Sequence, residues 1–400
     1  MVYKFIKWMQ SDLDEDIYLE QPEGFTDGTD RICKLNRLIY GLKQSGRVWN
    51  IKLENLLKST GLEKSKIDPC LYFNEERNLI LAIYVDDDIL IFWKDFVKLQ
   101  QLKEMLSSNF KMNDMGEAKN CIGIRITEFE DGIGLDQSAY VKEILSRFGM
   151  SDCKPSSTPS DPGTKLSKDM QDTSKDAENT QKIPYQEAVG CLLYLAQGTR
   201  PDIAFAVNDV SRFNTNFNLA HWKAVKRIFR YLKGTLNYKL RYKREENSLI
   251  GYTDSDWASD VDNRRSCTGF VYKLSSAAIS WNSRRQSTVA LSSAEPEYMV
   301  LSSPTQEAIW LKQFEAEIDE GLNSTVKIYC DSQSAGIANL DGYRPRSKHI
   351  DIRHHYVREK LYDKTIQVEH LPTDEMIADN LTKAVSKHKH DFCSKSMGLC

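Results

Sequence analysis

Residues 79–93 read LILAIYVDDDILIFW, in which three aspartates interrupt a run of apolar and β-branched residues. A carboxylate buried in such surroundings is costly unless it is paired or binds a cation. A strand–turn–strand hairpin removes this conflict, because it places Asp86 and Asp87 at the tip and the apolar arms in a sheet. Adjacent carboxylates at such a tip suit a divalent metal ion, and metal held by carboxylates suits phosphoryl transfer. The alternative interpretation is a solvated acidic turn in an ordinary hairpin.

The composition is that of an ordinary soluble globular protein. The 400 residues predict two or three domains, and a net charge of −3 means that any attraction for nucleic acid must be local. Nine cysteines without a CxxC pair favour free thiols in a reducing compartment, cytoplasmic or nuclear. We expect no membrane span, because aspartates cut the longest apolar run, and no secretory signal at the start.

The sequence pattern divides the chain into four parts. Residues 1–150 alternate helical patterns with short strands, and residues 151–183, rich in proline, serine, aspartate and lysine, predict an exposed linker or long loop. Residues 184–245 have a helical pattern, and residues 246–400 predict an α/β domain with a mixed sheet. In this last part we expect a long helix near 292–319, a terminal helix that contains residues 378–381, and strands at 249–253, 268–272, 277–281, 326–330 and 366–371.

Four carboxylates in the last part come from four separate predicted elements. Asp254 follows one apolar strand, Asp331 directly ends another, Glu297 lies early in the long helix, and Asp379 lies in the terminal helix. If they converge at one end of the sheet, they can hold two divalent ions ~3.5–4 Å apart, which clamp an attacking water and a leaving oxygen. The alternative for each acid alone is an ordinary surface position. Pro296 suits the first turn of a helix.

A basic stripe is predicted within the helical part. Lys223, Lys226, Arg227, Arg230 and Lys233 recur at helical spacing, apart from the apolar residues of the same stretch. Such a stripe is either a solvated helix face or a helix laid along a phosphate backbone, and the residues alone favour neither.

Ten short segments follow one another along nearly the whole chain: IYLEQPEGF (17–25), LIYGLKQSGRVW (38–49), DPCLY (68–72), YVDD (84–87), GTRPDIA (198–204), RYLKGT (230–235), GYTDSDWA (251–258), LSSAEPEY (291–298), SKHIDIR (347–353) and IADNLTK (377–383). In this order they resemble the Pol polyprotein of copia-type LTR retrotransposons. The resemblance implies an α/β (α+β) protein: a truncated reverse-transcriptase palm with thumb or connection, followed by a ribonuclease H-like mixed-sheet domain.

The resemblance implies roles for the residues in these segments. Asp86 and Asp87 would be two of three polymerase metal ligands, and Gln44 would contact the incoming nucleotide of a template–primer complex. The ribonuclease H quartet would consist of Asp254, Glu297, Asp331 and Asp379, with neighbouring Asp256 and Glu295 as alternatives in the first two positions. This quartet would hold Mg²⁺, or Mn²⁺ as a substitute, and cleave RNA in RNA–DNA hybrids. Independently of the resemblance, Lys226, Arg227 and Arg230 of the basic stripe are the candidates for contacts with nucleic acid.

Two departures from the family pattern concern activity. Tyr3 stands where the alignment requires the third polymerase carboxylate, and the upstream fingers segment is missing, so we expect the polymerase half to be an inactive remnant. Pro296 stands in the family's "EAEY" segment, although the nuclease quartet is formally complete. The sequence therefore leaves two hypotheses, a hybrid-cleaving ribonuclease and a non-catalytic, degenerate relic that binds nucleic acid.

Overall fold

The computed structural model describes most of the chain and divides it into two units. The residues described are 2–5, 15–36, 39, 42, 44–84, 88–170, 182–244, 248–256, 260–286, 294–319, 324–331 and 348–400, with the backbone alone at 2–5, 294–300 and 348–354. Unit 1 consists of Met1–Ile122 with Glu317–Asp319, and unit 2 consists of Gly123–Ala316 with Glu320–Cys400. The division after Ile122 differs from the boundary at residue 150 predicted from the sequence.

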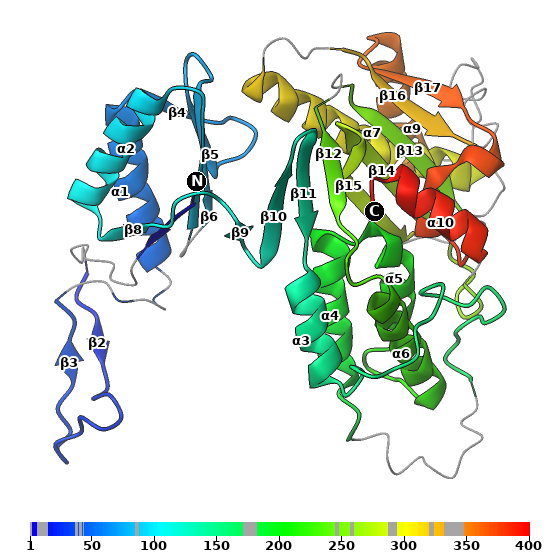
Figure 1. The fold of residues 1–400 in the computed structure, drawn as a ribbon, viewed down its shortest axis with the longest axis horizontal. Coiled ribbons are helices and arrows are strands. Elements are labelled where there is room, and N and C mark those ends of the chain that lie inside the picture. Colours follow the sequence, from blue (N-terminus) through cyan, green and yellow to red (C-terminus); the bar gives the residue numbers. More distant parts are fainter. Residues whose placement is uncertain are drawn as a thin grey trace. The chain divides into compact units, whose positions relative to one another are not determined.

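Unit 1 is built on an antiparallel sheet (Figure 1). Its strand order is β4 (Leu62–Lys64), β5 (Leu71–Asn74), β6 (Leu79–Tyr84), β7 (Asp88–Trp93), β1 (Val2–Phe5) and β8 (Met112–Asp114). The helices α1 (Ser45–Ser59) and α2 (Phe96–Asn109) share a core with this sheet that includes Leu53, Leu57, Leu81, Ile91 and Leu99. A separate two-stranded pair joins β2 (Tyr18–Leu19) to β3 (Cys33–Lys34).

The predicted hairpin forms. Strands β6 and β7 pair antiparallel from Leu79 opposite Trp93 to Tyr84 opposite Asp88. Alternate residues of β6 and β7 are buried, as expected for a sheet with one face on a helical core. The tip residues Asp86 and Asp87 lie outside the described residues.

Unit 2 begins with a sheet and a helical bundle. Strands β10 (Ile124–Phe129), β11 (Gly132–Asp136) and β12 (Leu240–Lys243) are neighbours in one sheet, so segments about a hundred residues apart in sequence pair directly. The helices α3 (Ser138–Arg147), α4 (Tyr185–Gly198), α5 (Ala204–Ser211) and α6 (Leu219–Gly234) share one apolar core (Figure 1). A short 3₁₀ helix η2 (Pro201–Ile203) connects α4 to α5.

The predicted linker contains no helix or strand in its described part, residues 151–170, and most of these residues are exposed. Thr158 and Leu166 are buried, and Leu166 belongs to the core of the helical bundle. Backbone N–H of Ser156 donates to the carbonyl oxygen of Arg230 on α6 at 3.1 Å. The described part of this segment is therefore a largely exposed loop with a few buried residues, and hydrogen bonds to α6, which sequence composition does not reveal, attach it to the helical bundle.

The C-terminal part of unit 2 is the mixed sheet expected from the sequence. Its order is β15 (Ala277–Arg285), β14 (Cys267–Leu274), β13 (Ile250–Ser255), β16 (Val326–Cys330) and β17 (Ile366–His370). Strand β14 is antiparallel to both neighbours, whereas β13, β16 and β17 are parallel. The helices α7 (Ala294–Ile318) and α9 (Lys348–Tyr362) follow β15 and precede β17, respectively, along the chain. The α/β (α+β) class is therefore confirmed.

The end of the chain differs from the prediction. Residues 378–381 lie in a 3₁₀ helix, η4 (Ile377–Leu381), which follows another short one, η3 (Thr373–Glu375). The terminal α-helix, α10 (Lys387–Ser396), begins only after Ser386, whose side chain accepts a hydrogen bond from the backbone N–H of Lys389. The N-cap at Ser386 starts a separate helix, so the predicted helix through residue 379 is wrong.

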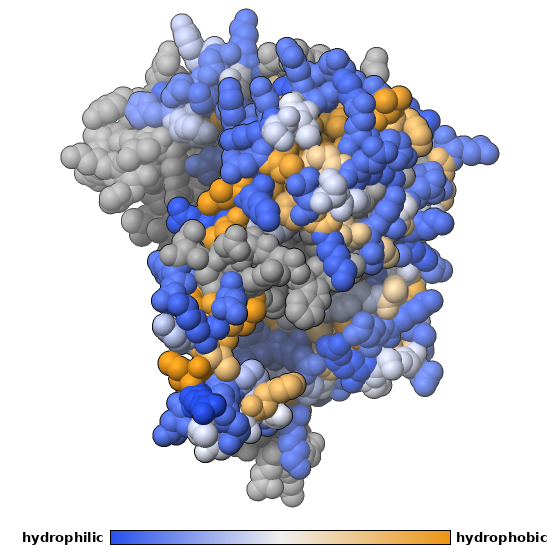
Figure 2. Space-filling view, turned by 90° about the vertical axis from the view of Figure 1, so that its left-hand side faces the viewer, coloured by the Kyte–Doolittle hydropathy of each residue, from blue (hydrophilic) through white to orange (hydrophobic). Residues whose placement is uncertain are grey.

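No helix among the described residues has both the length and the apolar character needed to cross a bilayer. Hydrophilic residues cover most of the face shown in Figure 2, and hydrophobic residues form smaller groups between them.

Candidate metal centre

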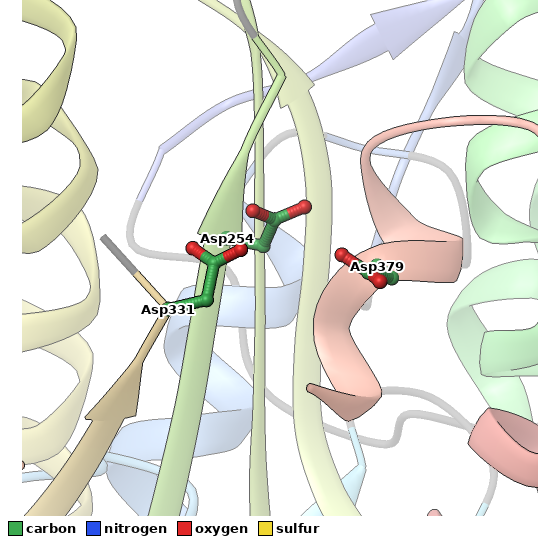
Figure 3. A group of neighbouring side chains, drawn as sticks. All are labelled: Asp254, Asp331 and Asp379. Carbon is green, nitrogen blue, oxygen red and sulfur yellow. The ribbon is translucent and has the colours of Figure 1, made fainter. Parts of the chain in front are cut away.

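Three carboxylates from three elements meet at one edge of the mixed sheet. Asp254 lies in β13, Asp331 directly follows β16, and Asp379 lies in η4. One oxygen of each lies within 4.8 Å of one oxygen of each of the others. Figure 3 shows the three side chains directed toward the same space. Asp254 and Asp379 are buried and Asp331 is partly exposed, so the group is open on one side.

Strand register explains why two of these acids meet. Strands β13 and β16 are parallel neighbours, and Thr253 pairs with Cys330. Asp254 and Asp331 are the next residues in the two strands, so both leave the sheet at the same edge. The sequence predicted this part of the site from the apolar runs before each acid.

Close packing of η4 against β14 brings in the third acid. Gly269 in β14 lies beside η4, and a Cβ atom built there would come within 2.7 Å of the Leu381 Cβ and 2.8 Å of the Thr382 Cγ2. The hydroxyl of Thr382 donates to Asp254 Oδ2. The glycine thus permits a backbone approach that a larger residue would prevent, and Thr382 fixes the Asp254 carboxylate.

The electrostatic environment of Asp254 is dominated by burial. The pKa of its carboxyl is raised to about 7, chiefly because burial removes water from the charged form, and the carboxylates of Asp331 and Asp379 act in the same direction. The ammonium of Lys383 and the hydroxyl of Thr382 act in the opposite direction. A site with these properties favours a cation, because positive charge removes the repulsion among the carboxylates.

Two lysines that sequence reasoning missed contact the cluster. Lys383 Nζ lies 2.8 Å from Asp379 Oδ1 and 3.6 Å from Asp254 Oδ2. Lys389 Nζ lies 3.3 Å from Asp379 Oδ2 and also donates to the carbonyl oxygens of Thr373 at 2.6 Å and Asp374 at 2.8 Å. Lys383 follows Asp379 by four residues, a spacing that could have signalled the contact if the local helix had been certain.

The fourth predicted ligand lies where only the backbone is described. Glu297 and its alternative Glu295 both lie in the first turn of α7, which begins at Ala294, and Pro296 is accommodated in that same turn. Asp256, the alternative to Asp254, makes a different contact: its Oδ1 accepts the backbone N–H of Cys267 at 2.8 Å. Of these two aspartates, Asp254 is the one within the carboxylate group.

The polymerase residues are only partly described. Asp86 and Asp87 fall outside the described residues, but β1 lies beside β7 in the sheet, with Tyr3 opposite Ile89 and Lys4 opposite Asp88. Gln44 is exposed directly before α1, and its Nε2 donates to Glu15 Oε2 at 3.0 Å.

The basic stripe of α6 is not a plain solvated face. Arg227 donates from Nε and Nη2 to the carbonyl and hydroxyl oxygens of Thr158, at 3.2 and 2.9 Å. Arg230 Nε donates to the carbonyl oxygen of Lys154 at 2.7 Å. Together with Lys226, these arginines line a cavity of about 670 Å³ between α6 and the segment 159–166. Both arginines therefore hold a chain segment in place, whereas no such bond is described for Lys226.

The sequence is similar to a known protein family and to known polyproteins. A family profile described as reverse transcriptase (RNA-dependent DNA polymerase) matches residues 6–162. The chain is 42% identical over 400 residues to the retrovirus-related Pol polyprotein from transposon TNT 1-94 of Nicotiana tabacum, a match that covers 98% of this chain and 30% of that protein. It is 35% identical over 395 residues to the corresponding polyprotein from transposon RE1 of Arabidopsis thaliana, which covers 97% of this chain and 26% of that protein.

Among solved structures, the foamy viral protease–reverse transcriptase in complex with dsDNA has a TM-score of 0.48 and 14% sequence identity, over 91% of this chain and 70% of that chain. The chain spans less than a third of the length of the two polyproteins that it matches.

Proposed function

This chain belongs to the copia-type retrotransposon Pol polyproteins, and we propose that it cleaves the RNA strand of RNA–DNA hybrids at its C-terminal carboxylate cluster. The observation that carries the proposal is the meeting of Asp254, Asp331 and Asp379 with their oxygens within 4.8 Å. Three acids packed this closely from separate elements are unfavourable unless a cation compensates them.

The donor set fits a hard divalent cation. Carboxylate oxygens are the ligands that Mg²⁺ and Mn²⁺ prefer, and one side of the cluster is open. Asp254, Asp331 and Asp379 would hold the metal, with Glu297 of α7 as the fourth ligand. When bound, such metal activates water and stabilises the charge that develops on a phosphodiester.

The chain's own residues prepare the site for this reaction. Thr382 donates to Asp254, and Thr373 Oγ1 donates to Asp331 Oδ2 at 3.2 Å, so two of the carboxylates have fixed orientations. Water would attack the phosphodiester directly, and the reaction would have no covalent intermediate with the protein. We infer the substrate class from the family, because reverse transcription produces RNA–DNA hybrids.

Contacts to the rest of the hybrid are proposed for α6. Lys226, Arg227 and Arg230 lie on one stretch of this helix and would meet phosphates of the duplex. Two of these residues already hold the segment 154–158, so Lys226 is the one that we expect to contribute most directly.

For the polymerase half we propose no activity. The strand β1 is the neighbour of β7, and its residues Tyr3 and Lys4 pair with Ile89 and Asp88 at the start of that strand. Two-metal polymerisation needs a carboxylate scaffold for both ions, so a tyrosine in place of the third ligand removes most activity. Template-directed nucleotide incorporation that is lost in Asp86→Asn would contradict this.

The alternative function is that of a non-catalytic relic that binds nucleic acid. Pro296, between Glu295 and Glu297 in the first turn of α7, is the observation that favours it. Binding of an RNA–DNA hybrid without cleavage in Mg²⁺ would support this alternative.

The test is cleavage of a labelled RNA–DNA hybrid by the full chain in Mg²⁺. We expect cleavage by the wild type and none by Asp331→Asn, which keeps the shape of the side chain but removes its charge. Asp331→Asn should also raise the stability of the metal-free protein, because one repelling charge is gone. Asp374→Asn, a change at an exposed acid nearby, serves as the control and should cleave normally. Wild-type cleavage by Asp331→Asn would overturn the proposal.

A further inference from the structure

We propose that Lys383 is a displaceable counter-cation of the metal centre. Its ammonium group compensates the carboxylates when no metal is bound, and it moves into a neighbouring cavity when a divalent ion arrives. This inference rests on the proposed metal-dependent function of the same cluster.

The position of Lys383 is the first argument. Its Nζ bridges Asp379 Oδ1 at 2.8 Å and Asp254 Oδ2 at 3.6 Å, which are oxygens of two of the three acids that would bind metal. A divalent ion uses carboxylate oxygens as direct ligands. An ammonium group and a metal ion at the same oxygens repel each other, and the ammonium, on a flexible four-carbon stem, is the one that can leave.

Lys389 provides the contrast within the same site. Its ammonium contacts Asp379 Oδ2 at 3.3 Å, but it also donates to the carbonyl oxygens of Thr373 and Asp374. These two carbonyl partners remain when metal binds, so Lys389 keeps its place. Lys383 and Lys389 therefore carry the same charge at similar distances from Asp379, yet only Lys383 also contacts Asp254.

A place for the displaced side chain lies next to the site. Lys383 lines a cavity of about 260 Å³ whose wall also includes Asp256, Arg212 and Arg285. Arg212 pairs with Asp209 and Asp260, and Arg285 pairs with Asp260.

Two acids line this cavity: Asp209 pairs with Arg212 and Arg285, and the Asp256 carboxylate accepts the Cys267 backbone N–H. We assign Asp256 as the group that receives the ammonium. Asp256 would thus act as the acceptor of the ammonium and not as a metal ligand, since it lies outside the cluster of Asp254, Asp331 and Asp379.

Calorimetric titration of Mg²⁺ into the full chain tests the inference, in an Asp86→Asn, Asp87→Asn background that silences the polymerase carboxylates. Lys383→Met preserves the length of the stem and removes the charge, and we expect it to bind Mg²⁺ about tenfold more tightly than the background protein. Lys389→Met also removes a charge beside Asp379 but leaves the contact of Lys383 with Asp254 in place, so we expect a smaller gain in affinity than from Lys383→Met. Equal effects of the two substitutions, or weaker binding by Lys383→Met, would overturn the inference.

A crystal structure of the unmutated full chain with Mn²⁺ tests the same inference without relying on a variant that folds. We expect manganese among Asp254, Asp331 and Asp379, with the Lys383 ammonium turned toward Asp256. A bound ion with Lys383 still at its present distances from Asp254 and Asp379 contradicts the inference but leaves the proposed function intact. Failure of the background protein to bind either metal contradicts the proposed function itself.

Discussion

At the scale of single residues, the buried carboxyl of Asp254 links the stability of the metal-free protein to pH. Its pKa of about 7 in the folded protein lies above the value of about 3.9 in an unfolded chain. The contribution of this group to stability is therefore fully present below about pH 4 and is lost as the pH rises through about 7.

We expect the metal-free wild type to lose stability relative to Asp254→Asn between about pH 4 and pH 7, by on the order of 2–4 kcal/mol. The amide in the variant does not titrate, so the difference isolates this one group from all others. Urea unfolding in the presence of a chelator measures it. Added Mg²⁺ should reverse the loss in the wild type, because a ligand that binds only the folded state stabilises it. A pH-independent difference between the two proteins would show that Asp254 is ionised throughout.

Part of this site could be predicted residue by residue and part could not. Asp254 and Asp331 each follow an apolar strand, and that local signal is visible in the sequence. Lys383, Thr382 and Gly269 gave no such signal, because their roles arise only when η4 packs against β13 and β14. Contacts of this kind join residues over a hundred positions apart, and no periodicity records them.

At the scale of elements, the close approach of η4 to β14 depends on Gly269. Replacing it with alanine places a Cβ within 2.7 Å of Leu381, so η4 must shift and carry Asp379 with it. We expect Gly269→Ala to cost about 1–3 kcal/mol of stability and to weaken Mg²⁺ binding. Thermal unfolding and metal titration measure the two effects.

Gly190→Ala is the matched control for this change. Gly190 lies within α4, where an added Cβ meets nothing within 4 Å, so alanine should stabilise that helix by about 0.5–1 kcal/mol. Metal affinity should be unchanged in the control. Unaltered Mg²⁺ binding in Gly269→Ala would mean that the position of η4 does not determine the site.

The basic side chains of helix α6 have two different roles. Arg227 holds the segment around Thr158, whereas Lys226 is proposed to meet phosphate. We expect Lys226→Ala to leave stability unchanged and to reduce the salt dependence of hybrid binding by about 0.9, the value for one phosphate contact. Arg227→Ala should instead destabilise the protein, because it removes two hydrogen bonds that fix this segment.

Binding isotherms at several salt concentrations and urea unfolding distinguish these two effects. If the salt dependence of binding is unchanged in Lys226→Ala, Lys226 does not contact phosphate and is simply a solvated residue of α6. The sequence placed these cations on one side of a helix correctly, but composition alone could not show that the proline-rich segment packs against them.

At the scale of the whole molecule, the helical region and the mixed sheet belong to one unit although the sequence suggested a boundary at residue 245. The Trp281 indole N–H on β15 donates to the carbonyl oxygen of Ala196 on α4 at 2.7 Å. His390 of α10 lies 3.0 Å from the carbonyl oxygen of Asp202, with Nε2 as the contacting atom. The side chain of Asp202 is buried in an ion pair with Arg200, and it also accepts the hydroxyl of Tyr231 at 2.7 Å.

These contacts predict how fragments of the chain behave. A fragment of residues 246–400 lacks β12, which supplies buried Leu240 to the core beside β14 and β15 and whose Tyr242 hydroxyl donates to the Ala278 carbonyl oxygen at 2.7 Å. It also lacks the helices that receive Trp281 and His390. A fragment of residues 123–400 keeps all of these partners.

We therefore expect the 123–400 fragment to unfold in one cooperative thermal transition, and the 246–400 fragment to melt at least about 10 °C lower or to aggregate. Circular dichroism and tryptophan fluorescence follow the two transitions. Adding Mg²⁺ should raise the melting temperature of the longer fragment, since it contains the complete carboxylate cluster. If the shorter fragment melts at the same temperature with the same response to metal, the mixed sheet is an independent domain, and the boundary predicted from the sequence is the correct one.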